Sequence, residues 1–275
     1  MSLFHVVLLA IVQGITEFLP VSSSAHLALA PWLFGWPDQG LTFDIALHFG
    51  TLLAVLLYFF RDWLQILAQG FGIRYAPDPA LRRNPRLLWL LLIGTIPVAI
   101  AGLALEDYVE TTFRTPYLIG AMLILIGLLM GWADRAARQT KRIGEVSAPD
   151  GLTIGAAQAL AIVPGTSRSG ITIIAGLFRG LDRETAARFS FLLSAPAIGG
   201  AAFKALLDLI GQGGVEPGLE IPFILGMLVS ALTGCLVIKY FLQFLRGHTL
   251  RFFVAYRVIF GIIVIALAFF RRAAG

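Results

Sequence analysis

Two short polar stretches interrupt an otherwise apolar chain of 275 residues. The first, EFLPVSSSAH, begins at Glu17 and sets a carboxylate, three consecutive serines and a histidine beside a proline. Gln13 and Glu17 are four residues apart, so they share one face of a helix. Ser23 and His26 are three apart and can also face the same way. A hydroxyl, an imidazole and a carboxylate can supply a nucleophile and a base, so this stretch predicts a reactive site.

The second stretch, VPGTSRSGIT, begins at Val163 and places Arg168 in a Gly/Ser/Thr turn. A helix N-terminus presents unpaired N–H groups and a partial positive charge, and the planar guanidinium fits phosphate oxygens. This combination favours an anion site, with phosphate expected, over an arginine that snorkels to the membrane interface. The residues that we expect to bind phosphate together with Arg168 are Ser22, Ser24, Gly165, Thr166, Ser167, Ser169 and Gly170.

A meeting of the two stretches would bring two helix N-termini to one point. Arg168 would then neutralise and orient phosphate, while Glu17, with Gln13, would hold a divalent cation through oxygen ligands. Either Ser23 attacks with His26 as its base, or His26 itself attacks, and the residues leave both open. The set suits phosphoryl transfer, which depends mainly on positioning and charge stabilisation.

The elements that must position these residues are membrane helices. Apolar residues make up 58% of the chain and charged residues 13%, against about 25% charged in soluble domains. Apolar segments near the roughly 20 residues needed to cross a bilayer predict an all-α polytopic membrane protein. These segments cover roughly 42–60, 87–106, 116–133, 187–210, 221–245 and 250–270.

Two further apolar segments, 3–34 and 151–178, are shorter and are broken by a proline and a Ser-rich turn. Each predicts a re-entrant helical hairpin, because irregular backbone at membrane depth is tolerated where it is buried in protein or lines a cavity. The serines alone would fit a plain helix–turn–helix that satisfies backbone groups. Glu17 favours a functional site, because an ionisable residue in a membrane costs roughly 2.5–3.5 kcal/mol and is usually functional.

The two halves of the sequence resemble each other. Gln13 and Gln158, Pro20 and Pro164, and Phe43 and Phe189 are separated by 145, 144 and 146 residues. Such a near-constant offset indicates an internal duplication, and matching interrupted segments point to a site near the bilayer midplane. We therefore predict an inverted repeat in which each half has one hairpin and three spans. The first repeat covers 1–134, a cytoplasmic linker covers 135–150, and the second repeat covers 151–275.

The distribution of Lys and Arg predicts the orientation. The net charge of +5 is concentrated in short connections around 61–86, 135–142, 179–188 and 246–251, which the positive-inside rule makes cytoplasmic. This excludes nucleic acid as the reason for the charge. Both termini and the opening of the first hairpin then fall outside, so the active site is expected on the extracytoplasmic face. Arg271 and Arg272, at the C-terminus, oppose this orientation.

QGITE, FLPVSSSAH and PGTSRSG resemble the undecaprenyl-diphosphate phosphatase family associated with bacitracin resistance, and the resemblance covers nearly the whole chain. It implies a bacterial inner-membrane enzyme that hydrolyses the C55 isoprenyl diphosphate and recycles the lipid carrier of peptidoglycan synthesis. It also implies Mg²⁺ or Ca²⁺ as a cofactor and functional roles for Glu17, Ser23, His26 and Arg168. Gln13 stands where many members of the family have Glu, which removes one charge from the metal site.

Two alternatives to this enzyme are weighed against the residues. A flippase or secondary transporter for an anionic lipid or phosphate compound would also use inverted repeats, but it needs no nucleophile and base, and lipid flipping could accompany hydrolysis. The type-2 phosphatidic acid phosphatases need a second histidine with an acidic partner, and His248 lies too far along the chain at a cytoplasmic turn. Gly127 and Gly131 have a spacing that suits close helix packing, within one chain or between the chains of a homodimer.

Overall fold

The computed structural model describes residues 2–36, 41–105, 115–211, 214–215 and 218–274. Within these ranges the chain is almost entirely helical, and its one β-type pairing is an isolated bridge between Lys141 and Leu181. The helices are α1 (Leu3–Thr16), α2 (Ser23–Phe34), α3 (Leu41–Tyr58), α4 (Phe60–Gly70), α5 (Pro79–Arg82), α6 (Leu87–Ala104), α8 (Pro116–Ala136), α9 (Ala148–Ala159), α10 (Arg168–Phe178), α11 (Arg183–Gly211), α12 (Glu220–Leu245) and α13 (Arg251–Ala274). The all-α class is confirmed.

The long helices α6, α8, α11, α12 and α13 are each apolar and long enough to cross a membrane. The predicted span at 42–60 differs, because the helix breaks at Phe59 and bends by 75° between α3 and α4. Beyond the bend, Arg61 and Asp62 make the sequence too polar to remain in the bilayer core. Counting this bent pair as one span gives the six that the sequence predicts, within the described residues.

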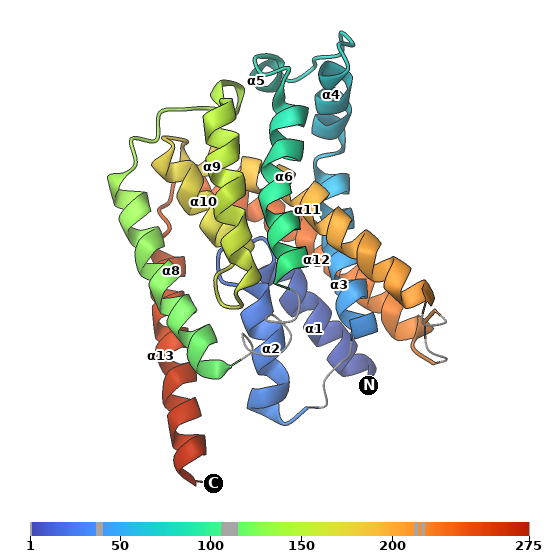
Figure 1. Cartoon of the computed structure of the whole chain (residues 1–275), viewed down its shortest axis with the longest axis vertical. Coiled ribbons are helices and arrows are strands. Elements are labelled where there is room, and N and C mark those ends of the chain that lie inside the picture. Colours follow the sequence, from blue (N-terminus) through green and yellow to red (C-terminus); the bar gives the residue numbers. More distant parts are fainter. Residues whose placement is uncertain (1, 37–40, 106–114, 212–213, 216–217, 275) are drawn as a thin grey trace.

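Two helical hairpins enter the molecule from opposite ends (Figure 1). The first consists of α1 and α2, within the predicted limits of 3–34. The second consists of α9, a short 3-10 turn at Leu160–Ile162, and α10. It begins at Ala148, three residues before the predicted start, because Ser147 and Asp150 form a capping box. In the figure α1 and α2 occupy the lower half, α9 and α10 occupy the upper half, and their turns lie at mid-height.

The basic connections gather at one end of the bundle, the upper end in Figure 1, where α4 and α5 lie. Ion pairs join the connections to one another: Lys141 and Arg179 with Asp150, Arg183 with Asp134, Arg188 with Asp62 and Asp78, and Arg246 with Glu184. The positive charges predicted to share one side of the membrane therefore do share one end. The sequence also has acidic residues in the connections that should lie at the other end, and of these Glu106, Asp107, Glu110 and Glu216 lie outside the described residues.

Arg271, whose charge opposed the predicted orientation, interacts with the end of α2. Its guanidinium lies over the Trp32 ring, 4.5 Å from the ring centroid, and donates hydrogen bonds to the carbonyl oxygens of Trp32 and Leu33. A helix C-terminus carries a partial negative charge and unpaired carbonyl groups, which a cation satisfies. Arg271 thus caps the C-terminus of α2, at the end of the bundle that carries both chain termini.

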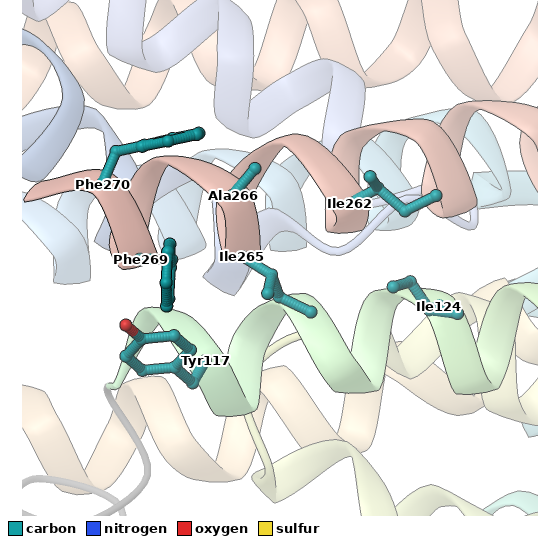
Figure 2. Close-up of a pocket in the computed structure, with 7 residues that line it drawn as sticks. All are labelled: Tyr117, Ile124, Ile262, Ile265, Ala266, Phe269 and Phe270. Atoms are coloured by element: carbon teal, nitrogen blue, oxygen red, sulfur yellow. The ribbon is translucent and has the colours of Figure 1, made fainter. Parts of the chain in front are cut away.

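α8 and α13 lie side by side, and Gly127 and Gly131 face α13 of the same chain. In the described residues, the two glycines therefore allow close packing between helices of one chain. The homodimer stays a prediction. A shallow cavity of about 490 Å³ lies between the two helices, lined by Tyr117, Ile124, Ile262, Ile265, Ala266, Phe269 and Phe270 (Figure 2). This groove is apolar apart from one phenol hydroxyl, so it is separate in character from the polar cluster described next.

Candidate active site

Each hairpin turn ends in a serine that caps the following helix. Ser22 accepts a hydrogen bond from the backbone N–H of Ala25 at 3.4 Å, and Ser167 accepts one from Gly170 at 3.1 Å. Both serines have positive φ, +79° and +71°, which costs a non-glycine residue of the order of 1–3 kcal/mol and is typical of functional sites. The same strained cap therefore occurs at equivalent points of the two repeats.

Glu17 joins the two hairpins. Its Oε1 lies 2.7 Å from Nη2 of Arg168, the first residue of α10, although 151 residues separate the two. Its Oε2 accepts hydrogen bonds from the Ser23 hydroxyl at 2.7 Å and from the Gln13 amide at 3.1 Å. Glu17 is 7% exposed and Arg168 13%. The predicted meeting of the two polar stretches is therefore present.

Two more hydrogen bonds hold Arg168 and its turn in place. Arg168 Nη1 donates to the carbonyl oxygen of Ser190 on α11 at 3.3 Å. The Ser169 hydroxyl donates to the carbonyl oxygen of Leu19, in the first hairpin, at 3.0 Å. The two turns are thus linked through backbone as well as through charge.

His26 points to a different neighbour from Ser23. Its Nδ1 lies 2.7 Å from the Ser22 carbonyl oxygen, and its Nε2 lies 2.6 Å from the hydroxyl of Tyr256 on α13. The imidazole also stacks on the ring of Phe260, at an interplanar angle of 20°, and lies nearly parallel to the ring of Tyr256, at 11°. The structure therefore pairs Ser23 with Glu17, and it gives both His26 nitrogens partners other than Ser23.

Arg257, the next residue on α13, is fully buried and reaches both turns. Its guanidinium donates to Pro20 O at 3.2 Å in the first hairpin, and to Gly165 O at 2.6 Å and Thr166 O at 3.1 Å in the second. It also donates to two carbonyl oxygens of α8, those of Met122 and Leu123. This buried cation has no carboxylate partner among the described residues and is stabilised by five backbone acceptors, so it fixes the turns against α8.

The other residues expected to bind phosphate lie around these turns. Ser22 and Ser24 hydroxyls are 3.1 Å apart, and Ser167 and Ser169 hydroxyls are 3.2 Å apart. Thr166 is fully buried, and its hydroxyl has no partner among the described residues.

The glycines of this turn serve close packing. Gly165 has φ +93°, and a Cβ there would lie 2.6 Å from the Ile119 carbonyl oxygen. A Cβ on Gly170 would lie 3.1 Å from Ser167. Their contribution to phosphate binding stays a prediction.

The residues predicted to hold a divalent cation offer two oxygen ligands. Glu17 supplies a carboxylate, and the buried Oε1 of Gln13 has no hydrogen-bond partner among the described residues. No group of three His, Cys, Asp or Glu side chains forms a metal site within the described ranges. One carboxylate and one amide oxygen fit Mg²⁺, which is often held by one or two protein ligands together with substrate phosphates.

The cluster combines positive charge with a hydroxyl group that donates to a carboxylate. Arg168 pairs with Glu17, and Arg257 bonds to the backbone of both turns, so the joint between the hairpins holds two guanidinium groups and one carboxylate and is net positive. The N-termini of α2 and α10 add their partial positive charges. Ser23 is the first residue of α2, and its hydroxyl donates its proton to the Glu17 carboxylate.

Tyr256, Arg257, Phe260 and Ser190 were not found from the sequence. Arg257 does carry a signal, because an ionisable residue in the middle of the apolar segment 250–270 marks a functional site by default. Tyr256 and Phe260 give no such signal, since aromatic residues are ordinary in a membrane span.

The chain is similar to a protein family across nearly its whole length. The family model described as bacitracin resistance protein BacA matches residues 6–263. A relative from Moorella thermoacetica, named undecaprenyl-diphosphatase, is 46% identical over 272 residues, which cover 99% of this chain and 100% of the relative. Relatives with the same name from Desulforudis audaxviator and Pelotomaculum thermopropionicum are 48% and 46% identical over 273 residues, covering 98% and 99% of this chain and 100% and 99% of the relatives.

Proposed function

The chain belongs to the bacitracin resistance protein BacA family, and we propose that its two hairpins together form the active site of an undecaprenyl-diphosphatase. The enzyme is a polytopic membrane phosphatase that hydrolyses undecaprenyl diphosphate to undecaprenyl phosphate and inorganic phosphate. Its product is the lipid carrier of peptidoglycan synthesis, and its activity confers resistance to bacitracin.

The contact between Glu17 and Arg168 is the observation that carries this assignment of the site. It brings the two family motifs to one point, at the N-termini of α2 and α10. Positive charge from Arg168 and the helix ends would receive the terminal phosphate. One terminal nitrogen of the Arg168 guanidinium is bonded to Glu17. This bond holds the guanidinium in a fixed orientation before substrate binds.

Ser23 is the nucleophile that the contacts favour. Its hydroxyl donates to Glu17 at 2.7 Å, so the carboxylate is placed to take the proton when the oxygen attacks phosphorus. Attack would displace undecaprenyl phosphate and leave a phosphoryl group on Ser23 Oγ, which water then hydrolyses. Both nitrogens of His26 are engaged elsewhere, which supports a role for this residue as a proton carrier rather than as the attacking group.

A divalent cation, Mg²⁺ or Ca²⁺, would be held by the Glu17 carboxylate and the Gln13 amide oxygen, which has no hydrogen-bond partner among the described residues. When bound, it would neutralise part of the diphosphate charge. Gln13 is therefore expected to matter for cation dependence, although it carries no charge itself.

The side of the membrane follows from the basic end of the bundle. Since the ion-paired connections share one end, the positive-inside rule places that end in the cytoplasm of a bacterial inner membrane. The first hairpin enters from the opposite end, so we propose that the site faces the extracytoplasmic side. Return of the product lipid across the membrane, and assembly into a homodimer, remain proposals that the inverted hairpins and small-residue packing allow.

Phosphate release by purified protein in detergent tests the assignment. A polyprenyl diphosphate is the substrate, with Mg²⁺, Ca²⁺ or a chelator, and Glu17→Ala and Arg168→Ala are compared with the wild type. We expect cation-dependent release that both substitutions reduce by at least about 100-fold, as for removal of a main charge-stabilising group.

Glu184→Ala and Arg246→Ala are the controls, because they break an Arg–Glu ion pair that lies at the protein surface, at the basic end. Both should keep the wild-type rate. Release that persists in Arg168→Ala, or that falls equally in the controls, would contradict the assignment. Substrate binding without release would favour a flippase instead.

A further inference from the structure

The hydrogen bonds of His26 define its tautomer. A carbonyl oxygen can only accept, so Nδ1 must carry the proton that bonds to the Ser22 carbonyl oxygen at 2.7 Å. The neutral ring then has its lone pair on Nε2. The Tyr256 hydroxyl, 2.6 Å away, must therefore be the donor to Nε2.

The ring plane of His26 is fixed as well. Phe260 stacks on the imidazole with a centroid separation of 5.0 Å, and the Tyr256 ring lies nearly parallel to the imidazole with a centroid separation of 5.9 Å. These two rings are one helical turn apart on α13, and they also stack on each other at 5.7 Å. A ring held at both nitrogens and on its face has little freedom to turn.

This arrangement controls how a proton reaches His26. The one lone pair of the imidazole is covered by the Tyr256 hydroxyl, whose oxygen keeps two acceptor sites of its own. Tyr256 is half-buried, while the guanidinium of Arg257, the next residue on α13, is turned toward the two hairpin turns. The phenol therefore stands between His26 and any proton donor that approaches Nε2.

We propose that Tyr256 is a positioning residue for the reaction, acting through His26. Its hydroxyl keeps the imidazole neutral with the lone pair on Nε2, and its ring keeps the imidazole in the plane required at the site. This inference rests on the proposed role of His26 in the phosphatase reaction. Nothing in the two family motifs includes Tyr256, which lies 230 residues from His26.

Tyr256→Phe tests the proposal with little steric change, because it keeps the stacked ring and removes only the hydroxyl. We expect kcat for phosphate release to fall about tenfold or more, with KM changed by less than about twofold, since positioning of a proton carrier affects the transition state and leaves substrate binding intact. Tyr117→Phe is the matched control, because this hydroxyl lies in the apolar groove of Figure 2; it should leave both constants unchanged.

Two further measurements separate positioning from a structural role. In a His26→Ala background, Tyr256→Phe should cause no additional loss of rate, because the two residues act as a unit. Nitrogen NMR of histidine-labelled protein should show Nδ1 protonated in the wild type, and a Nε2 resonance that moves toward that of a free imine nitrogen in Tyr256→Phe. The chain has four histidines, so the signals of His26 are those that His26→Ala removes.

A Tyr256→Phe enzyme with wild-type kcat, or with a raised KM and unchanged kcat, would overturn the proposal. So would an equal loss of rate in the His26→Ala background, or a wild-type spectrum in which Nε2 carries the proton. If the wild type itself released no phosphate, the assigned function would fail, and the NMR comparison would still decide whether Tyr256 sets the tautomer of His26.

Discussion

Arg168 and Glu17, 151 residues apart, form a buried ion pair of 2.7 Å at the point where two inverted hairpins meet. Ser23 and Gln13 donate to the same carboxylate, so both oxygens of Glu17 have partners before any substrate arrives. A site of this kind is pre-organised, because the groups that we propose to face the phosphate are already oriented by contacts with each other.

The ion pair should also stabilise the fold, in a non-additive way. Arg168→Gln or Glu17→Gln alone leaves one buried charge without its partner, which costs about 3 kcal/mol. The double variant leaves none, so its loss of stability should be smaller than the sum of the two single losses. Thermal unfolding midpoints in detergent measure this. Additive shifts would show that the pair contributes no coupling, and Glu184→Gln provides the control for a pair at the protein surface.

Arg257 should be needed for the assembly of the site. Arg257→Lys keeps the charge, but an ammonium group cannot bond to carbonyl oxygens of both turns and of α8 at once. We expect a lower unfolding midpoint and at least a tenfold lower rate of phosphate release.

Arg251→Lys is the matched control, because Arg251 is exposed at the start of the same helix. It should be neutral in both assays. A fully active Arg257→Lys enzyme would mean that the five carbonyl contacts do not position the turns.

The sequence predicted the helices and the meeting of the two motifs, and the physical reasons are local. Runs of apolar residues define the spans. In each hairpin a proline follows the first helix, and a serine that comes after it caps the second. The offset of about 145 residues between Gln13 and Gln158 indicated two equivalent hairpins, which can form one site only if their turns converge. That convergence is present in the contact of Glu17 with Arg168.

The surroundings of His26 could not be predicted in the same way. Spacing along one helix shows that Ser23 and His26 share a face, but not which other element covers that face. Ser23 is the first residue of α2 and folds back to Glu17, whereas His26 is one turn further on and meets α13. Tyr256 is ordinary in an apolar span, so only the tertiary packing reveals its contact.

Gly165 should tolerate no side chain. Its φ of +93° is unfavourable for L-residues, and a Cβ would lie 2.6 Å from the Ile119 carbonyl oxygen on α8. Gly165→Ala should therefore displace the second turn and lower both the unfolding midpoint and the rate of phosphate release. Gly200→Ala is the control, because no atom lies within 4 Å of its added Cβ. That variant should be neutral or more stable, since alanine favours the helix by up to about 1 kcal/mol.

Asp150 should make stability depend on pH at the basic end. Burial alone would raise the pKa of this carboxyl, but hydrogen bonds from Ser147, Arg179 and Lys141 outweigh it and lower the pKa from 3.8 to about 2. The folded protein thus binds this proton more weakly than the unfolded chain does. Asp150 therefore contributes its full stabilisation, about 2 kcal/mol, above pH 4, and loses it as the pH falls from about 4 to about 2.

Asp150→Asn reveals this contribution when unfolding midpoints of the variant and the wild type are compared at pH 7 and near pH 3. The wild type should be the more stable at pH 7, and the difference should shrink at the lower pH. A difference that stays constant or grows on acidification would contradict the assignment. Asp208→Asn is the comparison for an exposed carboxylate, and it should show little effect at either pH.

The orientation of the bundle can be measured with single cysteines in a Cys235→Ser background, because the chain has one native cysteine. The three sites for cysteine are Thr140 in the basic linker, Arg272 near the C-terminus, and Ser24, which is exposed at the start of α2. The variants are Thr140→Cys, Arg272→Cys and Ser24→Cys. If the positive-inside rule holds here, an impermeant maleimide should label the last two in intact cells or spheroplasts. Thr140→Cys should react only after permeabilisation. Labelling of Thr140→Cys alone in intact cells would show that the bundle has the opposite orientation. The site where Glu17 meets Arg168 would then be on the cytoplasmic side, because Ser24 lies beside that site on the same hairpin.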